Sequence, residues 1–169
     1  MLQHSVPENH LKAIGDITVS FAMLESQIQN LIGSLIYEHQ RVGQIITAEL
    51  SFKNLRALLI SLYLERHGED NDFNNLRAFM KRAGQTEDKR NQIIHSLWAA
   101  GKDKDHITRI KTTAKEKHGI RFKFEEVSAE NLQEFAKDIK ILSEELLRFK
   151  LDMLSRHKII NSPIKKLWP

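Results

Sequence analysis

The chain of 169 residues has no cysteine, and its seven glycines and three prolines are scattered. The lack of cysteine excludes disulfides, thiolate zinc sites and cysteine nucleophiles. Because no two glycines lie close together, the sequence contains neither a phosphate-binding loop nor a dinucleotide-binding motif. No His-Glu-x-x-His sequence occurs, and no glutamate is followed by a histidine three residues later. The sequence therefore predicts no metal site and no cofactor.

Long apolar runs are also missing from the chain. The longest run, residues 57–64, is interrupted by Ser61 and is far too short to cross a bilayer. Residues 1–10 are polar and lack the apolar core of a signal peptide. We therefore expect a cytoplasmic protein that does not enter a membrane.

The remaining composition, with 41% hydrophobic and 28% charged residues, is typical of a globular protein, and the length fits one domain over residues 1–169. Apolar residues recur every three or four positions, as they do in amphipathic helices. This spacing predicts helices over residues 7–38, 51–68, 70–82, 86–100 and 128–153. Gly43 is predicted to lie in a loop, and Gly68 and Gly84 to end helices. The predicted fold class is mainly α, an up-and-down bundle of about five helices.

Residues 101–127 differ from the helices, because short extended stretches of alternating apolar residues replace the helical spacing. A β-hairpin insertion is predicted near residues 106–127. Residues 101–123 also contain eight lysines and arginines against three acids, a net charge of +5, whereas the rest of the chain is almost neutral. Such localised charge suits an anionic partner, with a solvated surface as the simpler interpretation. Residues 157–169 form an apolar tail that is expected to dock on the bundle or on a partner.

The most distinctive segment is the predicted helix that begins near residue 86, where Arg90 and His95 lie five residues apart. Asn91 follows the arginine directly and lies one helical turn before the histidine, so Asn91 and His95 share a face. Ile93, Ile94 and Leu97, in the same segment, can point inward. Surface ion pairing of Arg90 and capping of a neighbouring helix by His95 are the structural alternatives to a functional site.

This segment resembles the Arg-x(4–6)-His motif of the HEPN superfamily (higher eukaryotes and prokaryotes nucleotide-binding), in which a polar residue follows the arginine. The predicted first helix, with Phe21-Ala-Met-Leu-Glu25, is similar to that of small bacterial proteins in this group. The resemblance implies a homodimeric helical bundle that acts as a metal-independent ribonuclease, as in toxin–antitoxin systems, with an antitoxin or another protein as partner. Toxins of this group that are nucleotidylated carry a tyrosine two residues after the histidine. Leu97 occupies that position here, which argues against such regulation.

A site of this kind cleaves RNA through attack of the 2′-hydroxyl on the neighbouring phosphate, a route that DNA lacks. In the HEPN-like interpretation His95 is the acid or base, Arg90 contacts the phosphate and Asn91 orients the site. One histidine cannot be acid and base at once, so a two-fold dimer that joins two copies would complete the site. Glu25 is a candidate second residue facing His95, with a solvated or ion-paired glutamate as the alternative. We expect single-stranded RNA as the substrate.

The basic hairpin is expected to hold the RNA backbone and not to read bases, since lysine-rich strands offer charge without a base-reading pattern. The residues concerned are Arg109, Lys111, Lys115, Lys117, Arg121 and Lys123. Phe122 and Phe124 are expected to cover the bundle, and Trp98 to lie in the core, in preference to stacking on RNA. The alternative function is a non-catalytic module of the same fold that binds RNA, a nucleotide or another protein.

Overall fold

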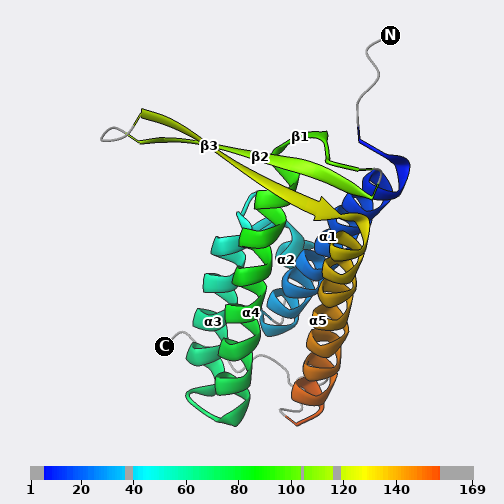
Figure 1. Cartoon of the computed structure of the whole chain (residues 1–169). Helices are drawn as coiled ribbons and strands as arrows, with labels where there is room; N and C mark the ends of the chain where they lie inside the picture. Colours follow the sequence, from blue (N-terminus) through cyan, green and yellow to red (C-terminus); the bar gives the residue numbers. More distant parts are fainter. Residues whose placement is uncertain (1–5, 37–39, 104, 116–118, 157–169) are drawn as a thin grey trace, which may run out of the picture. The chain divides into compact units, whose positions relative to one another are not determined.

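The chain is mainly helical, and a three-stranded antiparallel sheet is inserted between the fourth and fifth helices (Figure 1). The structure is a computed structural model that describes residues 6–36, 40–103, 105–115 and 119–156. In chain order, the described elements are α1 (Glu8–Ile36), α2 (Gln40–Thr47), α3 (Phe52–His67), α4 (Asn71–Ile94), β1 (Leu97–Ala100), β2 (His106–Lys115), β3 (Gly119–Ser128) and α5 (Ala129–Arg156). The predicted fold class, about five helices with a β insertion, is confirmed. None of the described helices is long and apolar enough to cross a membrane.

The described residues form two compact units, and the first contains those within 6–21 and 87–140. It combines the beginning of α1, the end of α4, the sheet and the first part of α5. Side chains from these elements form its apolar core: Ala13, Ile17, Phe21, Ile93, Ile107, Leu132, Phe135 and Ile139. Within α1 these positions recur at four-residue steps, which is the spacing expected of a helix that buries one face.

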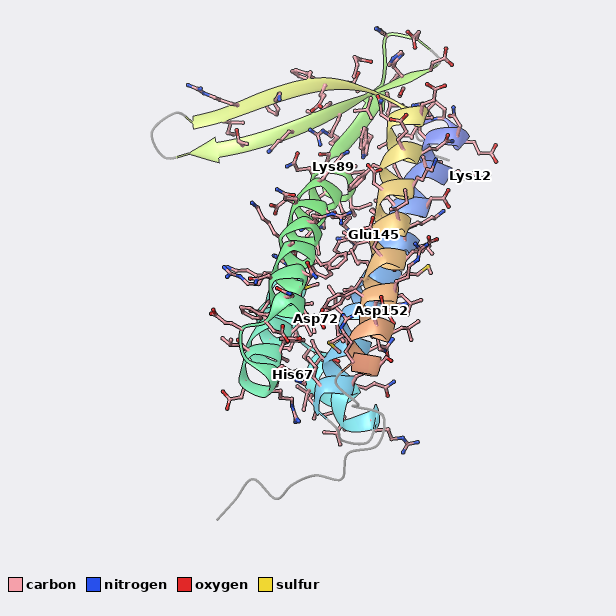
Figure 2. The ribbon with its side chains drawn as sticks, turned by 90° about the horizontal axis from the view of Figure 1, so that it is seen from below. Lys12, His67, Asp72, Lys89, Glu145 and Asp152 are labelled. Carbon is pink, nitrogen blue, oxygen red and sulfur yellow. The ribbon has the colours of Figure 1, made fainter. Side chains whose placement is uncertain are left out.

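The second unit contains the described residues within 22–86 and 141–156, and so includes all of α2 and α3 with the remaining parts of α1, α4 and α5. Its core includes Leu24, Ile28, Leu31, Leu55, Leu59, Tyr63, Leu76, Met80, Leu142, Leu146 and Met153. Arg156 binds Asp72 through two hydrogen bonds of 2.7 and 2.9 Å, and Arg82 binds Glu145 at 2.6 Å. These two ion pairs join α5 to α4 within the unit. Figure 2 labels their acidic members, Asp72 on α4 and Glu145 on α5.

The prediction that Gly84 ends a helix is wrong, because α4 continues through it and merges the helices predicted over residues 70–82 and 86–100. Gly84 is buried, and a Cβ atom there would lie 2.4 Å from the guanidinium of Arg56. The glycine therefore permits the close approach of a neighbouring side chain. The merged helix ends at Ile94, earlier than predicted, because the following residues pair with β2 as β1.

The prediction that Gly43 lies in a loop is also wrong, because Gly43 lies inside α2. A Cβ atom at Gly43 would come within 2.9 Å of the Cα of Gly33, so α1 and α2 meet backbone to backbone at this point. The Thr47 hydroxyl donates a hydrogen bond of 2.8 Å to the Gly43 carbonyl inside the helix. Gly68, in contrast, caps α3 as predicted: its φ is 75° and its amide donates to the carbonyl of Leu64.

Replacing Gly43 by alanine should lower the free energy of unfolding by about 1–3 kcal/mol, because the backbone at Gly33 would have to move. Gly15→Ala is the matched control, since Gly15 lies in α1 with nothing within 4 Å of its Cβ position. Alanine at that position should raise the free energy of unfolding by about 1 kcal/mol through helix propensity. Urea denaturation measures both values, and equal stabilisation by the two substitutions would contradict the close crossing.

Candidate functional site

The sheet presents one face to the helices of its unit and the other face to solvent. Ile107 of β2 is fully buried, and Val127 lies opposite it on β3. Alternate residues of a strand point to opposite faces, so the next inward pair is Arg109 and Glu125. Ile110 therefore points outward with its partner on β3. The register thus decides which side chains of the hairpin meet the helices.

Arg90 lies in the first unit, and two neighbours fix its guanidinium. The Cζ atom lies 5.2 Å from the centre of the Phe21 ring of α1. Nη1 donates a hydrogen bond of 2.9 Å to Oδ1 of Asn91. The Nε atom is buried and has no hydrogen-bond partner among the described residues. A guanidinium held in this way loses little further side-chain freedom when it binds an anion.

His95 directly follows the last residue of α4 and is exposed. Its amide donates to the carbonyl of Asn91 at 3.0 Å, which extends the helical hydrogen bonding by one residue and keeps both residues on one face. Within the described part of the chain, the imidazole has no hydrogen-bond partner. The structure therefore joins Arg90 to Asn91 and places His95 one turn after Asn91, while the described residues show no contact of the imidazole with either side chain.

Trp98 fixes the chain directly after His95. Its Nε1 donates a hydrogen bond of 3.1 Å to the carbonyl of Ile93, and its ring is half-buried. The Ser96 hydroxyl donates to the carbonyl of Gln92. The last turn of α4 and the start of β1 are therefore held together, and these bonds restrain the segment that carries the histidine.

A pocket of about 370 Å³ lies between the end of α4, the sheet and the start of α5. Inside it the amine of Lys89 lies 4.2 Å from the centre of the Phe135 ring, and Arg109 forms an ion pair with Glu125. Figure 2 labels Lys89 on α4 near the sheet. Of the described residues that line this pocket, none belongs to the motif. The pocket and the motif therefore use different faces of α4.

The six basic residues that were predicted to contact RNA phosphates differ in their surroundings. Arg109 faces the helices with 11% of its side chain exposed, and its Nη atoms bond to Gln92 and Glu125. Lys117 lies outside the described residues, and of Lys115 only the backbone is described. The exposed members are Lys111, Arg121 and Lys123. These three are accessible to an RNA backbone, whereas Arg109 is held in its ion pair.

Beyond Ile110, the described part of β2 pairs with β3 alone, and we call residues 111–115 and 119–123 the arm (Figure 1). Lys111 lies directly opposite Lys123 in the register, so two like charges share one face of the arm. Like charges in this position destabilise a strand pair by roughly 0.2–1 kcal/mol. The described residues of the arm include no carboxylate that would offset the repulsion. An anionic ligand would relieve it.

The prediction that Phe122 and Phe124 cover the bundle is wrong, because both are exposed on the outward face of the sheet. The inward orientation of Ile107 turns the even-numbered residues of β2 and β3 outward. Leu97, which the helical spacing allowed to point inward, is exposed too, because its partner in the register is the outward residue Ile110. The hairpin therefore has an apolar outer face and a basic inner face along the arm.

Glu25 is half-buried on α1 and belongs to the second unit, whereas His95 belongs to the first. A contact between these two residues stays a prediction, and so does a single domain over residues 1–169. The apolar tail predicted over residues 157–169 lies outside the described residues. In the part of the chain that the structure describes, no group of three or more histidine, aspartate or glutamate side chains is arranged to hold a metal ion.

Comparisons of the chain with protein-family models, with curated proteins and with solved structures found no match. The HEPN resemblance therefore stays a prediction that rests on the sequence of the motif and of the first helix. The contact of Phe21 with Arg90 and the bond from Trp98 to the carbonyl of Ile93 were not predicted. Phe21 fits the apolar spacing of α1, and no feature of the sequence connects it to Arg90.

Replacing Lys111 by glutamate should stabilise the arm, because an attractive pair with Lys123 replaces a repulsive one. We expect amide hydrogen exchange of the arm to slow by roughly two- to five-fold at low salt, and the gain to fade at high salt. The double variant Lys111→Glu/Lys123→Glu restores like charges and should return the exchange rates to those of the wild type. Exchange rates that stay the same in Lys111→Glu would contradict a repulsion between Lys111 and Lys123.

Proposed function

We propose that this protein is a metal-independent endoribonuclease of the HEPN type that cleaves single-stranded RNA. The observation that carries the proposal is the arrangement of Arg90, held by Phe21 and Asn91, with an exposed histidine one turn further along. These groups match the needs of RNA self-cleavage: a fixed positive charge at the phosphate and an imidazole that can accept or donate a proton. The HEPN resemblance of the same residues supports the proposal.

In the proposed reaction the ribose 2′-oxygen bonds to the neighbouring phosphorus while the bond from phosphorus to the 5′-oxygen breaks. A base takes the proton of the 2′-hydroxyl, and an acid gives a proton to the departing 5′-oxygen. His95 performs one of these transfers, and Arg90 stabilises the negative charge that develops on the phosphate oxygens. Asn91 keeps the guanidinium in position through its Oδ1. The products are a 2′,3′-cyclic phosphate and a 5′-hydroxyl.

The second proton-transfer group of this proposal comes from another copy of the chain in a two-fold homodimer. Two helices carry exposed apolar rows that suit such an interface. On α1, Val19 and Met23 are exposed one turn apart, and on α5 the same holds for Leu147 and Leu151. Apolar rows of this kind are typical of surfaces that become buried in a dimer.

A second candidate is a non-catalytic module of the same fold that binds RNA, a nucleotide or a partner protein. The exposed pair of Lys111 and Lys123 favours RNA binding and makes no use of His95. Purified protein that binds RNA and never cleaves it would favour this candidate over the endoribonuclease.

His95→Gln should lower the cleavage rate of single-stranded RNA by roughly 10²- to 10⁴-fold, the usual contribution of a positioned acid–base group. Arg90→Ala should lower it by on the order of 10²-fold or more, because the charge on the phosphate loses its stabilisation. His106→Gln is the matched control: His106 is a half-buried histidine of the same unit, and the rate should not change. Time courses with labelled RNA give the rates. Cleavage that persists in His95→Gln would overturn the mechanism.

The products and conditions of cleavage test the chemical route. Mass spectrometry should find 2′,3′-cyclic phosphate ends, and a chelator should leave the rate unchanged. DNA of the same sequence should survive, because it lacks the attacking hydroxyl. Products with a 3′-hydroxyl and a 5′-phosphate would mean that water is the nucleophile, which contradicts the proposal.

The dimer makes activity depend on protein concentration. Light scattering at micromolar concentration should give twice the mass of the chain, and the rate per chain should fall on dilution as the dimer dissociates. Full activity in a strict monomer would argue against a site shared between two copies.

A further inference from the structure

We propose that the open edge of β3 is a stacking platform for single-stranded RNA, with bases on Phe122 and Phe124 and phosphates near Lys111, Arg121 and Lys123. The strand order β1-β2-β3 leaves one side of β3 without a neighbour in the described sheet. The inference rests on the proposed function for its substrate class, because it describes how the RNA is held beside the motif.

Four large apolar side chains lie exposed on the outward face of the sheet. Their exposed fractions are 68% for Leu97, 66% for Ile120, 60% for Phe122 and 65% for Phe124. The register places Leu97, Ile110 and Phe124 in one row across the three strands. Phe122 and Ile120 lie on the same face further along β3. A contiguous apolar surface in water is typical of a binding site.

The two phenylalanines are spaced for stacking on neighbouring bases. They lie two residues apart on one strand, so their Cα atoms are about 6.7 Å apart and both rings leave the same face. Exposed aromatic rings on a sheet stack two or three bases in one common class of RNA-binding domain. Such stacking tolerates any sequence, because every base has a flat face. The pair therefore suits a strand whose bases are unpaired.

Basic and aromatic residues alternate along β3 in the order Arg121, Phe122, Lys123, Phe124. Because neighbouring side chains point to opposite faces, the rings leave one side of the strand and the cations leave the other. Lysine and arginine carry their charge at the end of a long flexible stem, so the charge can reach the edge from its own face. An RNA strand along the edge would meet rings on one side and positive charge on the other.

The charge of the arm favours RNA over a protein partner. Lys111 and Lys123 repel one another, and the described arm contains no carboxylate, so a polyanion gains more from this surface than an ordinary protein does. Glu125 and Glu126, which follow Phe124 on β3, are bonded to Arg109 and Thr108. The exposed apolar side chains present enough area for two or three bases.

The platform lies close to the motif along the sheet. Phe124 and Leu97 occupy one row, separated by β2. Adjacent strands are about 4.8 Å apart, so the Cα atoms of these two residues are separated by roughly 10 Å. His95 lies two residues before Leu97, so their Cα atoms are at most about 7.6 Å apart. A bound strand of a few nucleotides therefore spans the distance from the rings to the histidine.

Binding is measured with the His95→Gln protein, which leaves its ligand intact, and a fluorescein-labelled oligouridine of about twelve nucleotides. The added substitutions Phe122→Ala/Phe124→Ala should weaken binding by about 30-fold or more, since each stacked base contributes at least about five-fold. Because both rings are exposed, the variant should fold normally, which circular dichroism checks. Ile45→Ala/Ile46→Ala removes two exposed side chains of α2 and should bind as the parent does.

Two further double substitutions distinguish stacking from apolar contact alone. Phe122→Leu/Phe124→Leu keeps an apolar surface and should lose as much affinity as the alanine pair. Phe122→Trp/Phe124→Trp should retain the affinity. A 2-aminopurine base in the RNA should lose fluorescence on binding the parent protein and not on binding the leucine pair. The platform is overturned if either the leucine pair or the alanine pair binds RNA as tightly as the parent.

The other outcomes are equally decisive. If the alanine pair changes the mass measured by light scattering and leaves RNA affinity intact, the face contacts a second copy and the proposal falls. If wild-type protein cleaves no RNA while binding still depends on Phe122 and Phe124, the endoribonuclease fails and the platform stands. If His95→Gln abolishes cleavage while the phenylalanine variants bind normally, the platform fails and the endoribonuclease stands.

Discussion

The burial of Ile107 sets the orientation of the whole sheet. Side chains alternate along a strand, so one buried residue fixes the face on which each residue of β2 lies. The pairing register then fixes the faces of the residues in β1 and β3. Arg109 is turned under the sheet to Glu125, while Phe124 is turned to solvent. A slip of one residue in the register would exchange the two sets. Which side chains of the sheet face solvent is therefore a consequence of how the sheet is anchored to its helices.

The motif depends on a second anchor, at the junction of α4 and β1. His95 lies in the short link between them, and the bond from Trp98 to the carbonyl of Ile93 draws the strand back onto the helix end. Arg90 is positioned from another direction, by the ring of Phe21. In the proposed reaction Arg90 and His95 act on one phosphate, which requires that both side chains be held in position, because a mobile side chain loses its freedom on binding. The fold supplies restraints near both.

Most helices could be predicted because their apolar residues recur at helical spacing, as at Ile17 and Phe21 in α1. Two of the errors in the helix predictions arose at glycines. Gly43 and Gly84 look like breaks in the sequence, yet each lies within a helix where another segment approaches closely. Gly68 looks the same and does end a helix, with a φ of 75°. The sequence does not distinguish a glycine that ends a helix from a glycine that lets another segment approach a helix closely. The difference depends on the distant segment that contacts the glycine.

The sequence by itself determined the helical class, the β insertion with its localised charge, and the closeness of Asn91 and His95, because each of these depends on spacing along the chain. Tertiary structure decided the rest. It placed Phe21 under Arg90, tied Arg109 into an ion pair, and left Phe124 exposed. These features depend on which face of an element meets its neighbour. Packing between segments far apart in the chain determines which face is buried, and local periodicity cannot predict it.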